Sequence, residues 1–250
     1  MHNCPNTDRA PPKRAILLCA GRGSRLDPLT RDRPKCLVAA GGVPILDQQI
    51  ETLRACGIND VIIIGGYRHG DIADHIAAMP SSDQPELILN PFWASTNSIG
   101  SVWAAMSRLA DQFVVINGDT LFDAEIMSDL IARSKAGINL GVCTKPLEPD
   151  DMKVLMPNDQ IVAVSKQLPL CPATKCSMGI VIVRDGAQDY VDALTEVIGE
   201  EHGPQQFHHK IIDRLAQRGL VNPVVTDDTR WQEVDRPEDI DQWQRMDIAA

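Results

Sequence analysis

Short apolar runs alternate along the chain with segments whose apolar residues recur at helical spacing. The runs have the length and composition of strands that are buried on both faces. They occur at 15–20, 60–64, 86–90, 113–119, 138–144, 177–183 and 221–226, and the helical segments at 45–53, 71–78, 124–133, 187–198 and 207–218. This alternation predicts a single-domain α/β fold with a mostly parallel, doubly wound (Rossmann-like) sheet flanked by helices.

The bulk composition narrows the classes of partner. The formal net charge of −10 argues against nucleic acid, because it implies no broadly basic surface. No apolar stretch reaches the ~18 residues of a membrane-spanning helix, so no membrane partner is expected. The seven cysteines form no Cys-x-x-Cys pair, which disfavours a structural zinc site or a disulfide framework and indicates a reduced, cytoplasmic protein.

A loop with two glycines follows the first apolar run, and cations cluster in and just behind it. Glycines let backbone N–H groups converge on an anion without interference from a Cβ. Arginine and lysine side chains there supply charge for a polyphosphate. A solvated turn is the alternative, but such a cluster in an acidic chain favours a small anionic ligand. The loop residues are Gly21, Gly23 and Ser24, and the cations are Arg22, Arg25, Arg31, Arg33 and Lys35.

This stretch resembles the signature of the sugar-phosphate nucleotidyltransferases, which ends in a Pro-Lys pair. The chain carries Leu-Cys-Ala-Gly-Arg-Gly-Ser-Arg-Leu-Asp-Pro-Leu-Thr from residue 18 and Pro-Lys at 34–35, with Cys19 in place of the usual alanine. The resemblance implies that Arg25 holds the β- and γ-phosphates of a nucleoside triphosphate. It implies that Lys35 bridges the α-phosphate and the acceptor. The nucleotide-binding residues that it implies are Leu18, Ala20, Gly21, Arg22, Gly23, Ser24 and, further along, Gly118.

A polar loop at 90–97 leads into a helix that starts at or near Ser98. Its Asn-Pro-x-x-x-x-Thr-Asn-x-x-x-Ser-x-Trp pattern resembles the loop that phosphocholine and 2-aminoethylphosphonate cytidylyltransferases place beside the nucleotide base. The Gln-x-x-Pro-x-Gly loop of sugar nucleotidyltransferases is absent. By this resemblance Thr96, Asn97 and Ser98 contact a pyrimidine edge. The two tryptophans of the segment, Trp93 and Trp103, also suit a packing role.

Two acidic segments are candidates for a metal site. The apolar run at 113–117 ends in Gly118-Asp119, and the segment 231–235 alternates as a strand that places Glu233 and Asp235 on one face. The local pattern also allows Asp119 and Asp235 to cap the helices that follow them. In the resembled family such acids hold Mg²⁺, so the resemblance implies a Mg²⁺ cofactor bound by Asp119, Asp235 and Glu233.

The irregular stretch 145–176 predicts a small substrate-side insertion within a nucleotidyltransferase domain that spans 13–250, after a disordered tail at 1–12. Its Met-Lys-Val segment resembles the phosphocholine branch. The resemblance implies that Lys153 and Lys166 hold the phosphate of the acceptor, whereas the sequence alone fits solvated lysines. Lys175-Cys176 replaces a Gly-Glu pair of that branch, which argues against a cationic choline and favours a smaller or more anionic acceptor.

Three histidines invite a zinc interpretation, which their surroundings do not support. His202, His208 and His209 have no cysteine or carboxylate at ligand spacing, so we interpret them as polar residues of a loop and a helix start.

Together these features predict a Mg²⁺-dependent cytidylyltransferase. In its reaction a phosphate or phosphonate oxygen attacks the α-phosphorus of CTP and pyrophosphate leaves. One alternative is a sugar-1-phosphate nucleotidyltransferase that uses UTP, dTTP or GTP, against which the Thr96-Asn97 pair favours CTP. Another is a non-catalytic nucleotide-binding regulatory subunit, against which the retained lysines and acids argue. The sequence leaves open the acceptor, the strictness of the preference for CTP and whether the chain forms a homo-oligomer.

Overall fold

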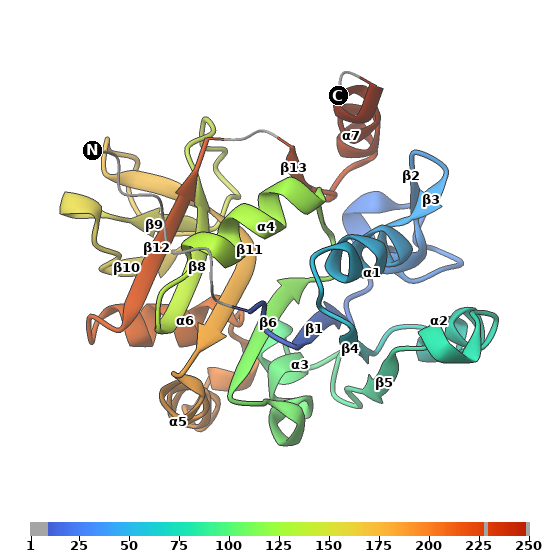
Figure 1. Ribbon diagram of the computed structural model, residues 1–250, viewed down its shortest axis with the longest axis horizontal. Coiled ribbons are helices and arrows are strands. Elements are labelled where there is room, and N and C mark those ends of the chain that lie inside the picture. Colours follow the sequence, from blue (N-terminus) through green and yellow to red (C-terminus); the bar gives the residue numbers. More distant parts are fainter. Residues whose placement is uncertain (1–9, 228–229, 249–250) are drawn as a thin grey trace.

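The computed structural model describes residues 10–227 and 230–248, and its centre is a nine-stranded sheet (Figure 1). The strand order β10-β9-β11-β6-β1-β4-β5 forms the main path, and β8 pairs with β11 and β12 beside it. These strands are β1 (Arg14–Cys19), β4 (Asp60–Gly65), β5 (Glu86–Leu89), β6 (Gln112–Asn117), β8 (Gly137–Cys143), β9 (Lys153–Leu155), β10 (Ala163–Ser165), β11 (Thr174–Arg184) and β12 (Val221–Thr226).

The parallel part of the sheet confirms the predicted α/β architecture. β1 lies between β6 and β4 and is parallel to both, and β5 extends this set in parallel. β11 is antiparallel to β6 and to β8, while β12 is parallel to β8. The carboxyl ends of β1 and β6 therefore meet at one edge, where a doubly wound sheet binds its ligands.

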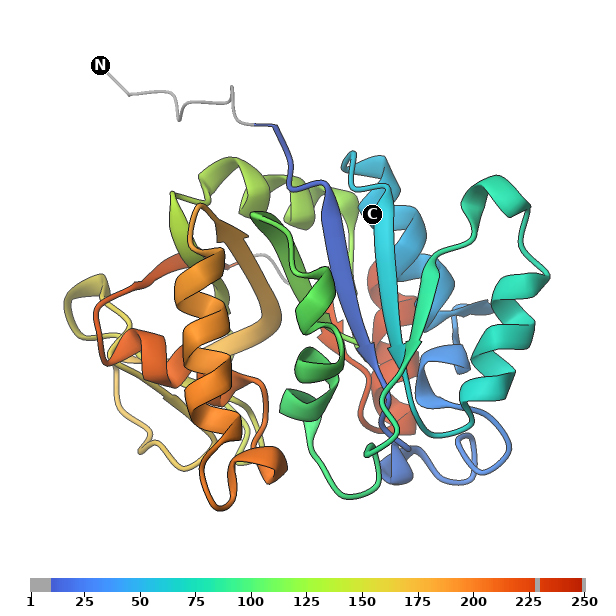
Figure 2. The same ribbon diagram turned by 90° about the horizontal axis from the view of Figure 1, so that it is seen from below.

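Helices cover both faces of the sheet (Figures 1 and 2). Along β1 the side chains alternate: Ile16 and Leu18 pack with α3, α5 and α6, while Leu17 and Cys19 pack with α1, α2 and α4. Burial on both faces explains the continuous apolar runs of the sequence. The helices are α1 (Ile45–Ala55), α2 (His69–Ala77), α3 (Ser98–Ala104), α4 (Ala124–Arg133), α5 (Ala187–Ile198), α6 (His209–Ala216) and α7 (Pro237–Ile248).

A third apolar cluster joins the glycine loop to the end of the chain. Leu26 of the loop is fully buried and packs with Val234 and with Trp243 of α7. Two small ribbons lie nearby: β2 (Ala39–Ala40) pairs with β3 (Val43–Pro44), and β7 (Thr120–Phe122) pairs with β13 (Trp231–Glu233). These contacts bring residues 26–40 against residues 234–243, although about 200 positions separate them in the sequence.

The predicted insertion at 145–176 supplies two short antiparallel strands to the main sheet. β9 pairs with β10 on one side and with β11 on the other, at the far end of the sheet from β5. Residues 1–9 of the predicted tail lie outside the described residues. Residues 10–12 contact the body of the protein: Arg184 donates to the Ala10 carbonyl, and Pro12 is buried. Within the described ranges no helix is long and apolar enough to span a bilayer.

Candidate active site

A cavity of about 220 Å³ opens at the carboxyl ends of β1 and β6. The predicted nucleotide-binding and catalytic residues that line it are Leu18, Ala20, Gly21, Lys35, Thr96, Asn97, Ser98, Gly118 and Asp119. Most of the predicted nucleotide site therefore converges on one hollow, although its residues come from three separate segments of the chain.

Lys35 lies at the base of this site, between two carboxylates. Its Nζ is 2.6 Å from Asp119 Oδ2 and 2.6 Å from Asp235 Oδ1, and the side chain is only 11% exposed. Burial would lower the pKa of Lys35, but Asp119 and Asp235 outweigh it and raise this pKa above its ordinary value. The lysine is therefore a fixed positive charge beside the cavity.

Gly23 does not line the cavity, but its backbone lies directly against the side chain of Lys35. Its φ is +68°, and a Cβ added there would lie 2.8 Å from both Cβ and Cδ of Lys35. The glycine therefore has two separate reasons to lack a side chain, namely its left-handed backbone and the close approach of the lysine.

Replacing Gly23 by alanine is expected to displace Lys35 and lower turnover more than tenfold, with a loss of about 1–2 kcal/mol in unfolding free energy from the left-handed backbone. Gly42→Ala is the matched control, because Gly42 has φ +85° but nothing within 4 Å of an added Cβ. The control should lose stability and keep its turnover. Chemical denaturation and steady-state rates measure the two effects, and equal rate losses in both variants would contradict the account.

Arg25 connects the glycine loop to the acidic residues. Its Nη1 is 2.9 Å from Asp235 Oδ2, and its Nη2 is 2.8 Å from Asp150 Oδ2 in the insertion. Burial would raise the pKa of Asp235, but Lys35 and Arg25 lower it below its ordinary value. Asp235 is therefore an ionised carboxylate shared by the two cations that the sequence singled out.

Neither Asp119 nor Asp235 caps the helix that follows it. Asp123, not Asp119, caps α4 by accepting a hydrogen bond from the Ile126 N–H. At α7 the carboxylate of Asp239 accepts from the backbone N–H groups of Asp235 and Arg236. The predicted strand 231–235 ends at Glu233, so Asp235 follows β13 instead of lying within it. The carboxylates of Asp119 and Asp235 thus remain directed at Lys35.

The acidic residues suit a hard divalent cation. Asp119 Oδ1 is buried and has no hydrogen-bond partner, so one oxygen of this carboxylate is uncommitted. Burial, together with Asp119 and Asp235, raises the pKa of Glu233 to about 8, as expected where carboxylates face one another. Among the described residues no three His, Cys, Asp or Glu side chains already form a metal site. Magnesium often takes only one or two carboxylates and completes its ligands with phosphate oxygens and water, so the pair Asp119 and Asp235 fits it.

The predicted base loop lines the cavity and is held by its own side chains. Asn97 caps α3 by accepting from the Ser98 N–H, and the Ser98 hydroxyl accepts from the His208 N–H. Thr96 donates its hydroxyl hydrogen to the Phe92 carbonyl. Trp93 also lines the cavity and packs edge-on against Tyr67 at 5.4 Å between ring centroids, whereas Trp103 is 40% exposed.

Several predicted residues lie at the margin of the cavity or away from it. Arg22 stacks on the Tyr67 ring at 5.7 Å, and Ser24 begins the short 3₁₀ turn after Gly23. Lys153 is buried, and its ammonium donates to the carbonyls of Pro149 and Lys166 instead of facing the cavity. Lys166 lies nearer: its Nζ is 5.0 Å from the ring centre of Phe207, which lines the cavity.

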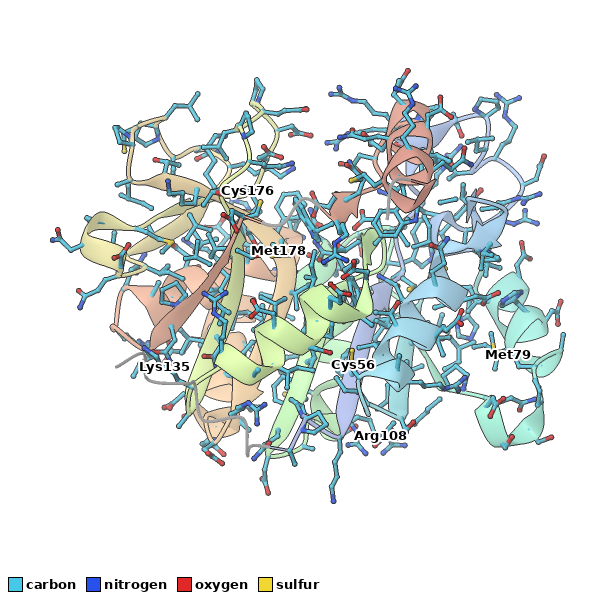
Figure 3. All side chains as sticks on the ribbon, turned by 45° about the horizontal axis from the view of Figure 1, so that its top comes forward. Cys56, Met79, Arg108, Lys135, Cys176 and Met178 are labelled. Carbon is cyan, nitrogen blue, oxygen red and sulfur yellow. The ribbon has the colours of Figure 1, made fainter. Side chains whose placement is uncertain are left out.

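Lys175 and Cys176 replace the Gly-Glu pair of the resembled branch. They lie on β11, opposite Val154 and Lys153 of β9. Cys176 is buried and also faces Cys143 of β8, and it lies close to Met178 along the strand (Figure 3). Cys176 therefore belongs to the core of the sheet and does not line the cavity.

A buried polar network supports Glu233 and was not found from the sequence. Asn117 Nδ2 donates to Glu233 Oε1 at 3.2 Å, and Asn117 Oδ1 is 2.9 Å from His208 Nε2. His209 contacts the Ser177 hydroxyl at 2.9 Å. His208 and His209 lie at the start of α6, as expected from the sequence, but both are buried and belong to this network. The signal in the sequence was weak, because a lone Asn before Gly-Asp and a His-His pair are common at surfaces.

Acid is expected to destabilise the protein through His208. Burial lowers the pKa of His208 to about 4, while an unfolded chain binds this proton near 6.5. The folded pKa is the lower one, so its neutral form stabilises the fold above pH 6.5 and this contribution is lost as the pH falls toward 4. Urea titrations give the unfolding free energies of the wild type and of His208→Gln. The advantage of the wild type over the variant should shrink by roughly 3 kcal/mol as the pH falls from 7 to 4. A constant difference across this range would contradict the assignment.

The sequence is similar to those of known nucleotidyltransferases. Residues 15–197 match a family model described as the MobA-like NTP transferase domain. The choline-phosphate cytidylyltransferase of Streptococcus pneumoniae is 32% identical over 144 residues, which cover 56% of this chain and 61% of that protein. The CMP-5'-(3-aminopropyl)phosphonate synthase of Streptomyces rubellomurinus is 26% identical over 243 residues, or 93% of this chain and 38% of that protein.

The fold also matches solved structures. A structure of CTP:phosphocholine cytidylyltransferase from Streptococcus pneumoniae superposes with a TM-score of 0.78 at 21% identity, covering 93% of this chain and 98% of that one. At this identity the match establishes the architecture alone. The sequence matches span less than two thirds of the length of the two curated relatives.

Proposed function

The chain belongs to the MobA-like NTP transferase family, and on that premise we propose that it is a Mg²⁺-dependent cytidylyltransferase. It couples CTP to a small phosphate or phosphonate and releases pyrophosphate. The relatives named as cytidylyltransferase and as CMP-phosphonate synthase support this choice. The observation that carries it is the position of Lys35 within 2.6 Å of both Asp119 and Asp235, beside the cavity.

The chemistry requires positioning and charge more than a base. The attacking oxygen of a phosphate or phosphonate is already anionic, so the main barrier is the approach of two negative groups. Lys35 would supply the positive charge between the α-phosphate of CTP and the acceptor. Backbone N–H groups of residues 20–23 would hold the triphosphate, and Arg25 its terminal phosphates.

The acids would hold the metal. Asp119 and Asp235 would hold Mg²⁺, with Glu233 held beside them by Asn117. When bound, Mg²⁺ neutralises charge on the triphosphate and aligns it for displacement. The Lys35 ammonium donates to both carboxylates and so holds Asp119 and Asp235 close together.

The base loop supports a pyrimidine nucleotide, and the named relatives favour CTP among these. Thr96, Asn97 and Ser98 line the cavity beside Trp93 and offer an amide and hydroxyls to a pyrimidine edge. We place the reaction in the cytoplasm, since every cysteine in the described part of the chain is a free thiol.

Pyrophosphate release tests the proposal directly. CTP, UTP, dTTP and GTP are each mixed with Mg²⁺ and with phosphocholine, phosphoethanolamine, 2-aminoethylphosphonate or glucose 1-phosphate. We expect CTP with a phosphonate or phosphate monoester to give rates at least tenfold above the other nucleotides. Faster release from UTP or dTTP with the sugar phosphate would instead assign a sugar nucleotidyltransferase. Nucleotide binding without release from any pair would indicate a regulatory subunit.

A further inference from the structure

Asp150, an acid with no role in the proposed reaction, bridges two cations beside the active site. Asp150 of the insertion accepts from two cations: its Oδ2 is 2.8 Å from Arg25 Nη2, and its Oδ1 is 3.3 Å from Lys166 Nζ. Arg25 belongs to the glycine loop, and Lys166 follows β10. One carboxylate thus joins a cation of the glycine loop to a cation of the insertion itself.

Lys166 is held in place by its surroundings, whereas the carboxylate of Asp150 is exposed and easy to displace. Lys166 is positioned over the Phe207 ring, and the buried Lys153 ammonium holds the backbone carbonyls of Lys166 and Pro149 at 2.6 and 2.8 Å. The side chain of Asp150 is 48% exposed. Exposed ion pairs of this kind contribute little, so a competing anion can replace it at small cost.

The neighbouring Asp151 has a structural role in this turn, which Asp150 does not share. It is buried, accepts from the Glu148 N–H at 2.7 Å and pairs with Lys145 at 3.2 Å. Asp151 therefore closes the turn. Asp150 is directed out of it, toward two cations at the margin of a phosphate site.

We propose that Asp150 is an internal stand-in for a substrate anion: it occupies Arg25 and Lys166, the two cations assigned above to phosphate groups, until a phosphoryl or phosphonyl dianion displaces it. Two oxygens of a dianion would take the places of the two carboxylate oxygens, and a doubly charged group would hold both cations more strongly than Asp150 does. This inference rests on the proposed function. The dianion is the phosphonate of the acceptor or the terminal phosphate of CTP, and binding of each ligand alone separates these sources.

Calorimetric titration without turnover tests the proposal. Wild type, Asp150→Asn and the control Asp159→Asn are each titrated with methylphosphonate alone and with CTP alone. Asp159 is an exposed acid of the same insertion, on the turn after β9, and no ion pair of the site involves it. We expect Asp150→Asn to bind one of the two ligands about three- to tenfold more tightly. The control should bind like the wild type, and adding Lys166→Met to Asp150→Asn should abolish the gain.

Two results would overturn the proposal. In the first, Asp150→Asn binds both methylphosphonate and CTP with wild-type affinity. In the second, Asp150→Asn binds 2-aminoethylphosphonate more weakly than the wild type does, which would make Asp150 a ligand for the substrate ammonium. Neither result depends on pyrophosphate release, so each is distinguishable from a failure of the proposed reaction.

Discussion

Replacing Lys35 by methionine is expected to lower CTP-dependent pyrophosphate release by at least about 10²- to 10³-fold. Methionine keeps most of the volume beside Gly23 but removes the charge that lies 2.6 Å from Asp119 and from Asp235. The same change leaves two carboxylates without their shared cation. The variant should therefore bind Mg²⁺ in the absence of nucleotide more tightly than the wild type, which calorimetry can measure.

Lys13→Met provides the control for this experiment. Lys13 is exposed just before the amino end of β1, and the cavity lies at the carboxyl end of the same strand. This variant should retain wild-type turnover and wild-type affinity for Mg²⁺. Turnover of Lys35→Met within tenfold of the wild type would show that the lysine does not contact the reacting phosphates.

Substituting asparagine for Asp119 or for Asp235 is expected to lower turnover by roughly 10²-fold or more at fixed Mg²⁺. The amide keeps the shape of each side chain but removes the charge that would hold the metal. Because both residues would serve one ion, the double variant should be less impaired than the product of the two single effects. Rates measured across a range of Mg²⁺ concentrations should show a higher requirement for the metal in each single variant.

Asp123→Asn is the matched control for the acidic pair. Asp123 lies four positions after Asp119 and caps α4, and asparagine is also a good capping residue. The control should fold and turn over like the wild type, with little change in stability. If Asp119→Asn or Asp235→Asn showed wild-type rates and an unchanged Mg²⁺ requirement, the acids would have no part in the reaction.

The sequence predicted the parallel core well because burial on both faces leaves an unmistakable pattern. The helix 187–198 and the strand 221–226 were predicted with the bounds that the structure has. The apolar spacing at 45–53 indicated α1, and Gly57, at φ +81°, follows this helix. These features depend on local patterns of apolar residues and glycine, which a single sequence displays directly.

Long-range geometry was harder to predict. Nothing local indicates that β11 runs antiparallel to β6, or that Leu26 packs with Trp243 and so draws Lys35 toward Asp235. The burial of Lys153 was also hidden, because its partners are backbone carbonyls and carry no sequence signature. Family resemblance named most of the residues that line the cavity, whereas Asn117 and His208 required the structure.

A crystal structure with CTP and Mg²⁺ but no acceptor tests the central claim most directly. We predict that the α-phosphate lies within hydrogen-bond distance of Lys35 Nζ, that the cytosine contacts the 96–98 segment and that the metal is bound by Asp119 and Asp235. A triphosphate bound elsewhere, with Lys35 still paired to both carboxylates, would contradict the account.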